Sequence, residues 1–380
     1  MKRFFALLLA LSLLLCACAS TPAETDPTTR PTTEPTTEPT TQPTTQPTEP
    51  STEPSTEATE PSTEPPVTEP IGFRHPITGL WLHQEEPYLV RPYAVVMDND
   101  DKTSGPHWGA GDADMIWELP HEGGSTRMVG VFSDVSDVNK LGPNRSVRPY
   151  ILSVAQCFKA ILVHAGGSPQ GYELLKDTGW DNLDGVEGVG AGKYYHRDQD
   201  KLNSGVASWH TMYTTGKEVL QYTKKLGYDT TFDKQADYGF TFADDGTPDG
   251  ESAETINIRF RSGGKKTDLY YDSEAGHYTM KQFSKTYVDG NNGNAVTFEN
   301  VLILKTGVKT IDDYGRLQVD MVGSGKGFFA CGGKIVPIKW SRSSANSSYT
   351  LTLEDGTPLT MGAGTTYVAV TYKNGTVNYQ

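Results

Sequence analysis

The sequence predicts an α+β fold in which an N-terminal mixed α/β domain precedes a smaller antiparallel β domain. Three observations lead to this prediction. Between residues 71 and 250, short apolar runs alternate with segments of helical periodicity, which is typical of layered α/β domains. After residue 250 apolar residues recur at every second position, as in Ile256, Ile258 and Phe260. Before residue 71 the chain has an apolar leader and a Thr/Pro/Glu-rich stretch, and neither can form a globular core.

The charge balance of the chain excludes two classes of protein. Its 380 residues include 33 Lys and Arg against 47 Asp and Glu, so the formal net charge is −14. A nucleic-acid binder needs a basic face to displace counterions from phosphates, and a polybasic membrane-surface protein needs clustered Lys and Arg. We therefore expect no nucleic-acid partner.

Residues 1–18 have the pattern of an export signal. Lys2 and Arg3 precede an apolar run that ends at Leu15, which is too short to span a membrane. The following Leu15-Cys16-Ala17-Cys18 resembles the lipobox of bacterial lipoproteins, with Cys18 as the lipidated residue. This resemblance implies a diacylglycerol on Cys18 and a protein anchored to the outer face of the cell membrane. The alternative is an ordinary secretory peptide with incidental cysteines.

Two cysteines, Cys157 and Cys331, remain beyond the leader. They lie far apart in the chain, and neither belongs to a Cys-x-x-Cys pair or to a metal-ligand spacing. We therefore expect two buried free thiols, and we expect neither a metal site nor a cofactor.

Residues 19–70 repeat Thr-Thr-Glu-Pro and related tetrapeptides. Proline recurs too often for a helix or a sheet, and almost no residue is apolar, so this segment is predicted to be a disordered, extended tether. It would hold the folded body away from the membrane. The segment could also contain a recognition motif for a partner, and the alternative is a passive spacer with no binding role.

Residues 71–250 contain the elements of the predicted α/β domain. The predicted strands are Tyr93–Met97, Met115–Leu119, Thr126–Phe132 and Ala160–His164. A helix is predicted over Arg148–Phe158, and a second one follows Ser168 as N-cap and Pro169 as the first helical residue. A third begins at Thr215, which forms a capping-box pattern with Glu218, and ends at Gly227.

Residues 251–380 read as a series of strands without a convincing helix. The predicted strands beyond Phe260 are Leu269–Tyr271, Tyr278–Met280, Val301–Leu304, Leu317–Met321, Tyr349–Leu353 and Tyr367–Val370. Asp355-Gly356 and Asn374-Gly375 are predicted hairpin turns. The glycine-rich segment 323–327 lies between strands with no helix after it, so we interpret it as a turn or bulge and not as a phosphate loop.

Three strings at the junctions of predicted elements indicate an anion-binding pocket. They are Glu122–Arg127, Gly142–Arg148 and His164–Pro169. Glycine lets backbone amides approach a ligand, a helix N-terminus offers unsatisfied N–H donors, and arginine matches carboxylate or phosphate. If the junctions converge, the expected ligand-binding residues are Arg127, Arg145, Arg148, His164, Gly166, Gly167, Ser168 and Arg197. The alternative is a structural network in which the arginines pair with Glu122 or Asp198.

A second interpretation of the same region is catalytic. The candidate acid–base groups are Glu122, His164, Asp198 and His210, because imidazole and carboxyl groups transfer protons near neutral pH. The histidines do not have the i, i+4 spacing of a zinc protease, so a metal is not expected. The alternative is that these histidines are hydrogen-bonded loop residues.

The ordered strings RPYAVVMDN, ADMIWELPHEGGSTRMVGVF, GPNRSVRPY, VHAGGSP and HRD resemble the YerB-like lipoproteins of Gram-positive bacteria. The resemblance covers roughly residues 77–225 and continues less distinctly to about 370. It implies an exported, membrane-anchored protein with a two-part domain of unknown function, and it carries no established activity. Trp209 stands where that family pattern has proline before the histidine, which weakens any role for His210.

The sequence therefore supports three hypotheses about function. The first is a membrane-anchored extracytoplasmic lipoprotein that binds an anionic small molecule or a cell-wall fragment. The second is an envelope hydrolase that uses Glu122 or His164 as its acid–base group. The third is a protein-interaction platform in which the β domain docks an envelope partner. The lipid membrane, reached through Cys18, is the one partner that all three share.

Overall fold

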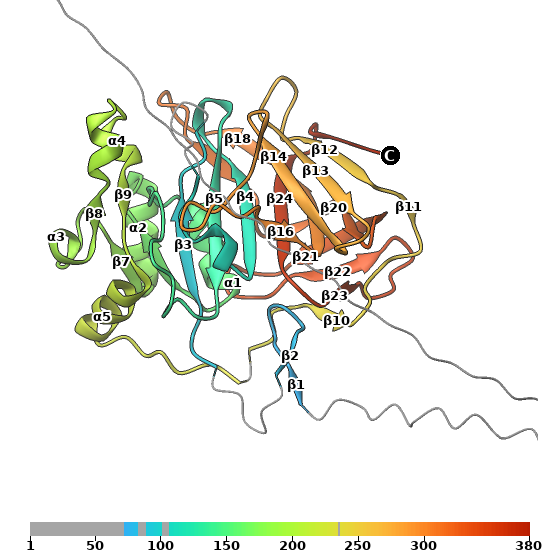
Figure 1. The fold of residues 1–380 in the computed structure, drawn as a ribbon, viewed down its shortest axis with the longest axis horizontal. Coiled ribbons are helices and arrows are strands. Elements are labelled where there is room, and N and C mark those ends of the chain that lie inside the picture. Colours follow the sequence, from blue (N-terminus) through green and yellow to red (C-terminus); the bar gives the residue numbers. More distant parts are fainter. Residues whose placement is uncertain (1–71, 83–88, 101–105, 235) are drawn as a thin grey trace, which may run out of the picture. The chain divides into compact units, whose positions relative to one another are not determined.

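One long mixed sheet runs through the folded part of the chain (Figure 1). In this computed structural model the described residues are 72–82, 89–100, 106–234 and 236–380. The signal peptide, Cys18 and the tether of residues 19–70 lie outside them. The sheet has eleven strands, and ten of them follow the order β11-β21-β20-β17-β24-β4-β5-β3-β6-β7, with β22 paired to β21. In that order they are Glu251–Ser252, Lys334–Arg342, Gly323–Cys331, Asn300–Thr306, Thr366–Tyr372, Met115–Pro120, Thr126–Phe132, Tyr93–Met97, Ile161–His164 and Asn182–Asp184, and β22 is Thr350–Leu353.

The two regions predicted as separate domains share this sheet. Strand β24 pairs in parallel with β4, so Val368 lies opposite Trp117, and β24 also pairs in parallel with β17. The region 251–380 is therefore not wholly antiparallel, which differs from the expectation. The physical reason is that β24 is buried along almost its whole length, as is typical of a central strand covered on both faces.

A second, smaller sheet is antiparallel and comes entirely from the C-terminal region. Its order is β15-β14-β13-β12-β25, with β16 paired to β14. These strands are Lys285–Thr286, His277–Gln282, Lys266–Asp272, Thr255–Arg259, Thr376–Tyr379 and Thr297–Phe298. Four two-stranded sheets complete the β structure: Phe73–Arg74 (β1) with Trp81–Leu82 (β2), His196–Arg197 (β8) with Met212–Tyr213 (β9), Thr241–Ala243 (β10) with Thr360–Gly362 (β23), and Val308–Thr310 (β18) with Leu317–Val319 (β19).

The helices lie in the N-terminal region, and most of them gather around β7 (Figure 1). They are α1 (Pro149–Cys157), α2 (Pro169–Thr178), α3 (Ala191–Tyr194), α4 (Gln199–Asn203) and α5 (Gly216–Leu226). The predicted caps are confirmed: Ser168 Oγ accepts from the amide of Gly171 at 3.0 Å, and Thr215 Oγ1 accepts from that of Glu218 at 3.2 Å. Residues 251–380, all of which are described, contain no helix, as predicted.

The two faces of the main sheet bury different partners. On one face, residues such as Val96, Trp117 and Val129 pack against α1. On the other face, Val95, Ile116 and their neighbours pack against the second sheet and α5. Because successive strand residues point to opposite faces, a strand between two such layers must be apolar at every position, and β3 is.

The segment 323–327 is part of a strand, which corrects its interpretation as a turn or bulge. Strand β20 pairs with β21 along its full length, from Gly323 opposite Arg342 to Cys331 opposite Lys334. A Cβ atom at residue 327 would lie 2.0 Å from the carbonyl oxygen of Ile303. Glycine is therefore needed at residue 327 because the backbone of the neighbouring strand β17 passes close to it, and not because a ligand binds there.

Two further predictions concern the cysteines and membrane spans. Cys157 and Cys331 are both buried free thiols, as predicted, and burial raises the pKa of Cys331 to about 11. Within the described residues, none of the helices has the length and apolar character needed to cross a membrane.

Candidate functional site

Three parallel strands end at the same edge of the main sheet. Strand β3 pairs in parallel with β6, and β6 pairs in parallel with β7. The loops that follow β6 and β7 begin at Ala165 and Gly185. In open α/β sheets, ligands bind in the crevice outside the carboxyl ends of such strands. This edge is therefore the first place to look for a site.

A cleft of about 280 Å³ lies at this edge, and we call it the arginine cleft. It is lined by Asn144, Arg145, Ser146, Ala165, Gly166, Gly167, Tyr172, Val186, Glu187, Arg197, Trp209 and Met212. Four of the residues expected to bind an anion are among them: Arg145, Gly166, Gly167 and Arg197. The second and third strings of the sequence thus meet in space, together with the segment around Arg197.

Asn144 is the least satisfied group in the arginine cleft. Its side chain is 1% exposed, and neither amide atom, Oδ1 or Nδ2, has a hydrogen-bond partner. The backbone of Asn144 is held by its amide, which donates to the carbonyl of Met212 at 2.7 Å. A buried polar group without a partner costs about 1–3 kcal/mol, so its retention in a cleft points to a ligand that supplies the missing hydrogen bonds.

A clamped turn forms one wall of the same cleft. The 3₁₀ turn Ser208–His210 carries Trp209, whose side chain is 62% exposed. Arg145 Nη1 donates to the carbonyl oxygen of Trp209 at 2.5 Å, and Arg197 Nη1 donates to that of Ser208. The two arginines hold the backbone of this turn, so the indole is presented to solvent from a fixed base.

Asp98 connects the turn to the sheet. It follows β3, and its carboxylate hydrogen-bonds with His210 Nδ1 and lies 3.4 Å from Arg145 Nε. Burial alone would raise the pKa of Asp98, but the hydrogen bond from His210 and the charges of Arg127 and Arg145 outweigh it. The pKa of Asp98 is therefore held well below its usual range, and the group is a carboxylate at any physiological pH.

Two of the residues expected to bind an anion belong instead to a network of ion pairs and hydrogen bonds. Arg148 Nε donates to Glu122 Oε1 at 2.7 Å, and His121 Nδ1 lies 2.6 Å from Glu122 Oε2. Arg127 Nη2 lies 2.5 Å from His121 Nε2, and Arg127 is 2% exposed. Burial and the charge of Arg127 lower the pKa of His121 to about 3, so this imidazole is neutral. For Arg148 the expected alternative, a pair with Glu122, describes the geometry. Arg127 contacts His121 instead, and its Nε and Nη1 atoms have no hydrogen-bond partner among the described residues. Neither arginine lines the arginine cleft.

The remaining candidates also have structural partners. His164 is fully buried, with Nδ1 2.9 Å from the carbonyl oxygen of Gly166 and Nε2 3.1 Å from Asn182 Oδ1. Ser168 caps α2. Asp198 caps α4 and lies 3.3 Å from Lys140 Nζ. None of the three lines the arginine cleft, although His164 and Ser168 shape the loop whose glycines do.

A larger cleft of about 570 Å³ lies between the β4–β5 turn and the second sheet, and we call it the lysine cleft. It is lined by Asn99, Asp100, Glu122, Gly123, Gly124, Ser125, Lys265, Lys266, Asp268, Lys281, Phe283 and Ser284. The first of the three predicted strings thus opens into a different cleft from the other two. The expectation that all three junctions share one cavity is corrected, because Glu122 and Arg148 pair with each other.

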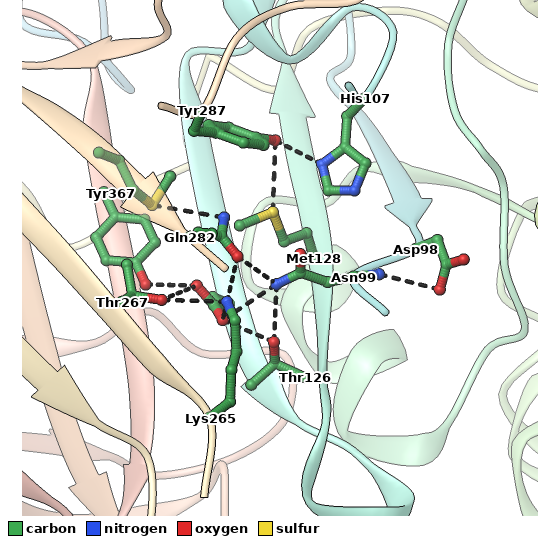
Figure 2. A network of polar contacts seen from close by, with 12 residues as sticks. Asp98, Asn99, His107, Thr126, Met128, Lys265, Thr267, Gln282, Tyr287 and Tyr367 are labelled. Atoms are coloured by element: carbon green, nitrogen blue, oxygen red, sulfur yellow. Dashed lines mark hydrogen bonds and ion pairs between the residues drawn. The ribbon is translucent and has the colours of Figure 1, made fainter. Parts of the chain in front are cut away.

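A buried polar network underlies the lysine cleft (Figure 2). The fully buried carboxylate of Glu118 on β4 accepts hydrogen bonds from Asn99, Thr126, Lys265, Thr267 and Tyr367. Lys265 Nζ also donates to Gln282 and Thr267. Burial lowers the pKa of Lys265. Every donor of this ammonium group is satisfied, which indicates a structural tie between the two sheets.

No group of three or more His, Cys, Asp or Glu side chains in the described ranges is arranged to hold a metal ion.

Family models match most of the chain. The N-terminal domain model of a protein family of unknown function, DUF3048, matches residues 77–229, and its C-terminal domain model matches residues 256–368. The chain belongs to the DUF3048 family. The resemblance to YerB-like proteins is thereby confirmed.

A curated relative and a solved structure agree with this membership. The chain is 27% identical over 300 residues to "Putative lipoprotein YerB" of Bacillus subtilis (strain 168), and the match covers 78% of this chain and 85% of the relative. The crystal structure of YerB from Bacillus subtilis has a TM-score of 0.68 and 24% identity, and covers 80% of this chain and 99% of that one. The second likeness shows the fold alone. The relative's name agrees with the lipobox expected at Cys18.

The two clefts of this DUF3048 protein differ in how they relate to the family domains. Every residue that lines the arginine cleft lies within the N-terminal match, residues 77–229. The lysine cleft and its network take residues from both matches, for example Asn99 and Lys281. The arginine cleft is therefore a property of one family domain, whereas the lysine cleft is made where the two domains meet.

Sequence reasoning missed two residues of the arginine cleft. Asn144 stands inside the second predicted string, between Pro143 and Arg145, but only the arginines of that string are among the expected ligand-binding residues. Trp209 directly precedes His210, which is an acid–base candidate, and the sequence gives Trp209 no role of its own in binding. The available signal for Asn144 was its position next to Arg145, an expected ligand-binding residue. The lack of a partner for its amide depends on residues that are distant in the chain, so no local sequence pattern indicates it.

Proposed function

We propose that this protein is a membrane-anchored extracytoplasmic lipoprotein that binds an anionic small molecule or cell-wall fragment in the arginine cleft. The observation that carries the proposal is Asn144, a buried amide with two unpaired polar atoms in a cleft beside Arg145 and Arg197. A ligand that hydrogen-bonds to this amide would relieve a cost that the unliganded protein bears.

The electrostatics of the cleft favour an anion. Arg145 and Arg197 each use one donor on the carbonyls of the Ser208–His210 turn, and a guanidinium group has five. Their planar forks match the geometry of a carboxylate. The carboxylate of Asp98 lies beside Arg145, but it is buried and also pairs with His210. Asp98 therefore positions Arg145 from outside the cleft.

The location at the carboxyl ends of β3, β6 and β7 supports the same function. Gly166 and Gly167 lie in the loop after β6, and the left-handed conformation of Gly166, with φ of 75°, favours glycine there. Together with the lipid expected on Cys18 and the extended tether expected over residues 19–70, this gives a binding body held near the outside of the membrane.

The hydrolase hypothesis is less well supported. It requires Glu122 and His164 to face one open pocket. Glu122 lines the lysine cleft and is paired with Arg148 and His121, whereas His164 is fully buried.

The platform hypothesis requires an exposed apolar patch on a sheet face. The exposed large apolar side chains of the described residues lie in loops, turns and a helix, apart from Phe73 in the two-residue β1.

Ligand-dependent stabilisation of the full chain in mild detergent tests the proposal. Acetate, lactate and inorganic phosphate are added at millimolar concentration, and the melting temperature is recorded. We expect at least one carboxylate to raise Tm, because a ligand that binds only the folded state stabilises it. Arg145→Ala should abolish the shift, whereas Lys326→Ala, which removes an exposed cation outside the cleft, should retain it. The proposal is wrong if no probe shifts Tm, or if both variants respond like the unmodified chain.

A further inference from the structure

Trp209 is exposed, yet its backbone is held by charged side chains. The residue is 62% exposed, while Arg145, Arg197 and Asp98 hold the carbonyls and the histidine of the turn that carries it. A large aromatic side chain on a mobile loop would lose conformational freedom when it bound a ligand. Here these contacts already order the backbone of the turn, so binding has to order only the side-chain rotamer of an indole that offers a flat contact surface.

Two kinds of polar group, guanidinium and amide, lie in the same cleft as this indole. The arginine cleft contains the guanidinium groups of Arg145 and Arg197 and the unpaired amide of Asn144. An amide side chain both donates and accepts, so its natural complement is another amide. The guanidinium groups complement a carboxylate, and the indole complements a ring with an apolar face. A single ligand that uses all of these groups has a ring, an amide and a carboxylate.

The acidic residue of the cleft limits the kind of ring. Glu187 also lines the cleft, and its charge is negative, whereas that of the two arginines is positive. Its carboxylate would repel a ligand with several phosphates, but it accepts hydrogen bonds from hydroxyl groups. A hydroxylated sugar ring satisfies Glu187, whereas a plain aromatic acid does not. The volume of about 280 Å³ is just below the usual range of ligand pockets, roughly 300–1,000 Å³, which suits one ring and its substituents.

We propose that the ligand of the arginine cleft is an N-acylated amino sugar that bears a carboxylate. This inference rests on the proposed function and names its substrate class. The sugar packs on Trp209, the acyl amide pairs with Asn144, and the carboxylate binds Arg145 and Arg197.

Three probes separate the parts of this recognition in calorimetric titration of the full chain in mild detergent. N-acetylmuramic acid has the ring, the amide and the carboxylate, N-acetylglucosamine lacks the carboxylate, and lactate is the carboxylate fragment alone. We expect N-acetylmuramic acid to bind at least about tenfold more tightly than either of the others, since each lost contact of this kind costs an order of magnitude or more.

Variants then assign the contacts. Trp209→Ala should weaken binding of N-acetylmuramic acid by about tenfold and leave that of lactate unchanged. Tyr314→Ala is the matched control, because Tyr314 is 72% exposed and does not line the arginine cleft. Trp209 is exposed, so its replacement should leave Tm unchanged, and this measurement verifies folding.

The outcomes distinguish this inference from the function on which it rests. If lactate binds as tightly as N-acetylmuramic acid and Trp209→Ala changes neither, the sugar class is wrong and anion binding stands. If N-acetylglucosamine binds as tightly as N-acetylmuramic acid, the carboxylate has no role and the class is wrong. If none of the probes binds and no carboxylate shifts Tm, both proposals fail.

Discussion

Asp98 and His210 lie 112 positions apart in the chain, and the Nδ1 atom of His210 hydrogen-bonds with Oδ2 of Asp98. The other carboxylate oxygen of Asp98 faces Arg145 Nε at 3.4 Å. A single buried carboxylate thus joins the end of β3, the wall of the arginine cleft and the turn that presents Trp209. The geometry of the cleft depends on this contact, although Asp98 itself does not line it.

Asp98→Asn should loosen the arginine cleft. The change removes the charge that orients Arg145 and His210, and hydrogen bonds to charged groups contribute about 2 kcal/mol. We expect the free energy of unfolding in urea to fall by about that amount, and the affinity for N-acetylmuramic acid to fall with it. Asp177→Asn, at an exposed position of α2, is the control and should change neither quantity. An Asp98→Asn variant with unchanged stability and affinity would show that this contact does not position the cleft.

Lys265→Met should strongly destabilise the protein. It leaves the carboxylate of Glu118, which has no exposed surface, without its counter-ion, and such a change costs about 3–5 kcal/mol. The double variant Glu118→Gln with Lys265→Met removes both charges and should recover part of the loss. Urea denaturation of both single variants and the double variant measures the coupling between the two residues. Additive effects of the two substitutions would contradict the role of this pair as a tie between the sheets.

Acid should destabilise the protein from below about pH 6.5. Burial lowers the pKa of His107 to about 4, and burial with the charge of Arg127 lowers that of His121 to about 3. Between about 6.5, the pKa of an unfolded histidine, and those folded values, the unfolded state binds more protons. Stability is therefore full above about pH 6.5 and is lost as the pH falls toward the folded pKa values.

The carboxylates add a second phase of the same sign. The pKa values of Asp98 and Glu122 are lowered in the folded state, so their contribution is present above the unfolded pKa of about 4 and is lost below it. Urea midpoints between pH 7 and pH 3 measure both phases. His107→Gln should reduce the slope between about pH 6 and 4 by about 1.4 kcal/mol per pH unit. An unchanged slope in this variant would mean that His107 is not a buried neutral histidine.

Asn144→Leu should have opposite effects on stability and binding. Leucine has a similar size and no polar atoms, so it removes the two unpaired amide atoms and should raise the free energy of unfolding by about 1 kcal/mol. It also removes the group that we assign to the ligand's amide, so binding of N-acetylmuramic acid should weaken. Urea denaturation and calorimetric titration test the two effects separately. A less stable variant with unchanged binding would show that Asn144 has a structural role only.

Cys18→Ser should release the protein from the membrane. The expected anchor is a diacylglycerol on Cys18, and without a covalent lipid the remaining chain has no predicted attachment. We expect the unmodified protein in the detergent phase of a phase-separation experiment and the variant in the aqueous phase. Cys16→Ser, two positions earlier, is the matched control and should remain in the detergent phase. Equal partitioning of both variants with the unmodified protein would contradict lipidation at Cys18.

The elements with local patterns were predicted well. The strands Tyr93–Met97 and Thr126–Phe132 have the predicted bounds, and the helix caps at Ser168 and Thr215 form the predicted contacts. These features depend on residues within a few positions of one another, so the physical chemistry that decides them is contained in a short stretch of sequence.

The candidate site was predictable only in part. Arg145, Gly166, Gly167 and Arg197 do meet in one cleft. The loop that follows the parallel strand β6 places the two glycines at this edge of the sheet, whereas Arg145 and Arg197 reach it from other segments of the chain. Arg127 and Arg148 carry the same charge but pair with His121 and Glu122. Nothing near an arginine in the sequence tells which carboxylate or imidazole will lie beside it after folding.

The sequence alone therefore determined the leader pattern, the Thr/Pro-rich stretch, the nature of most strands and helices, and the membership of a family. The tertiary structure decided which residues share a cleft, that β24 pairs with β4 across the two family domains, and that Lys265 neutralises Glu118 147 positions away. It also decided that Asn144 is buried without a partner. The reason is that hydrogen-bond satisfaction and charge pairing belong to a residue's surroundings, and those surroundings are assembled from distant parts of the chain.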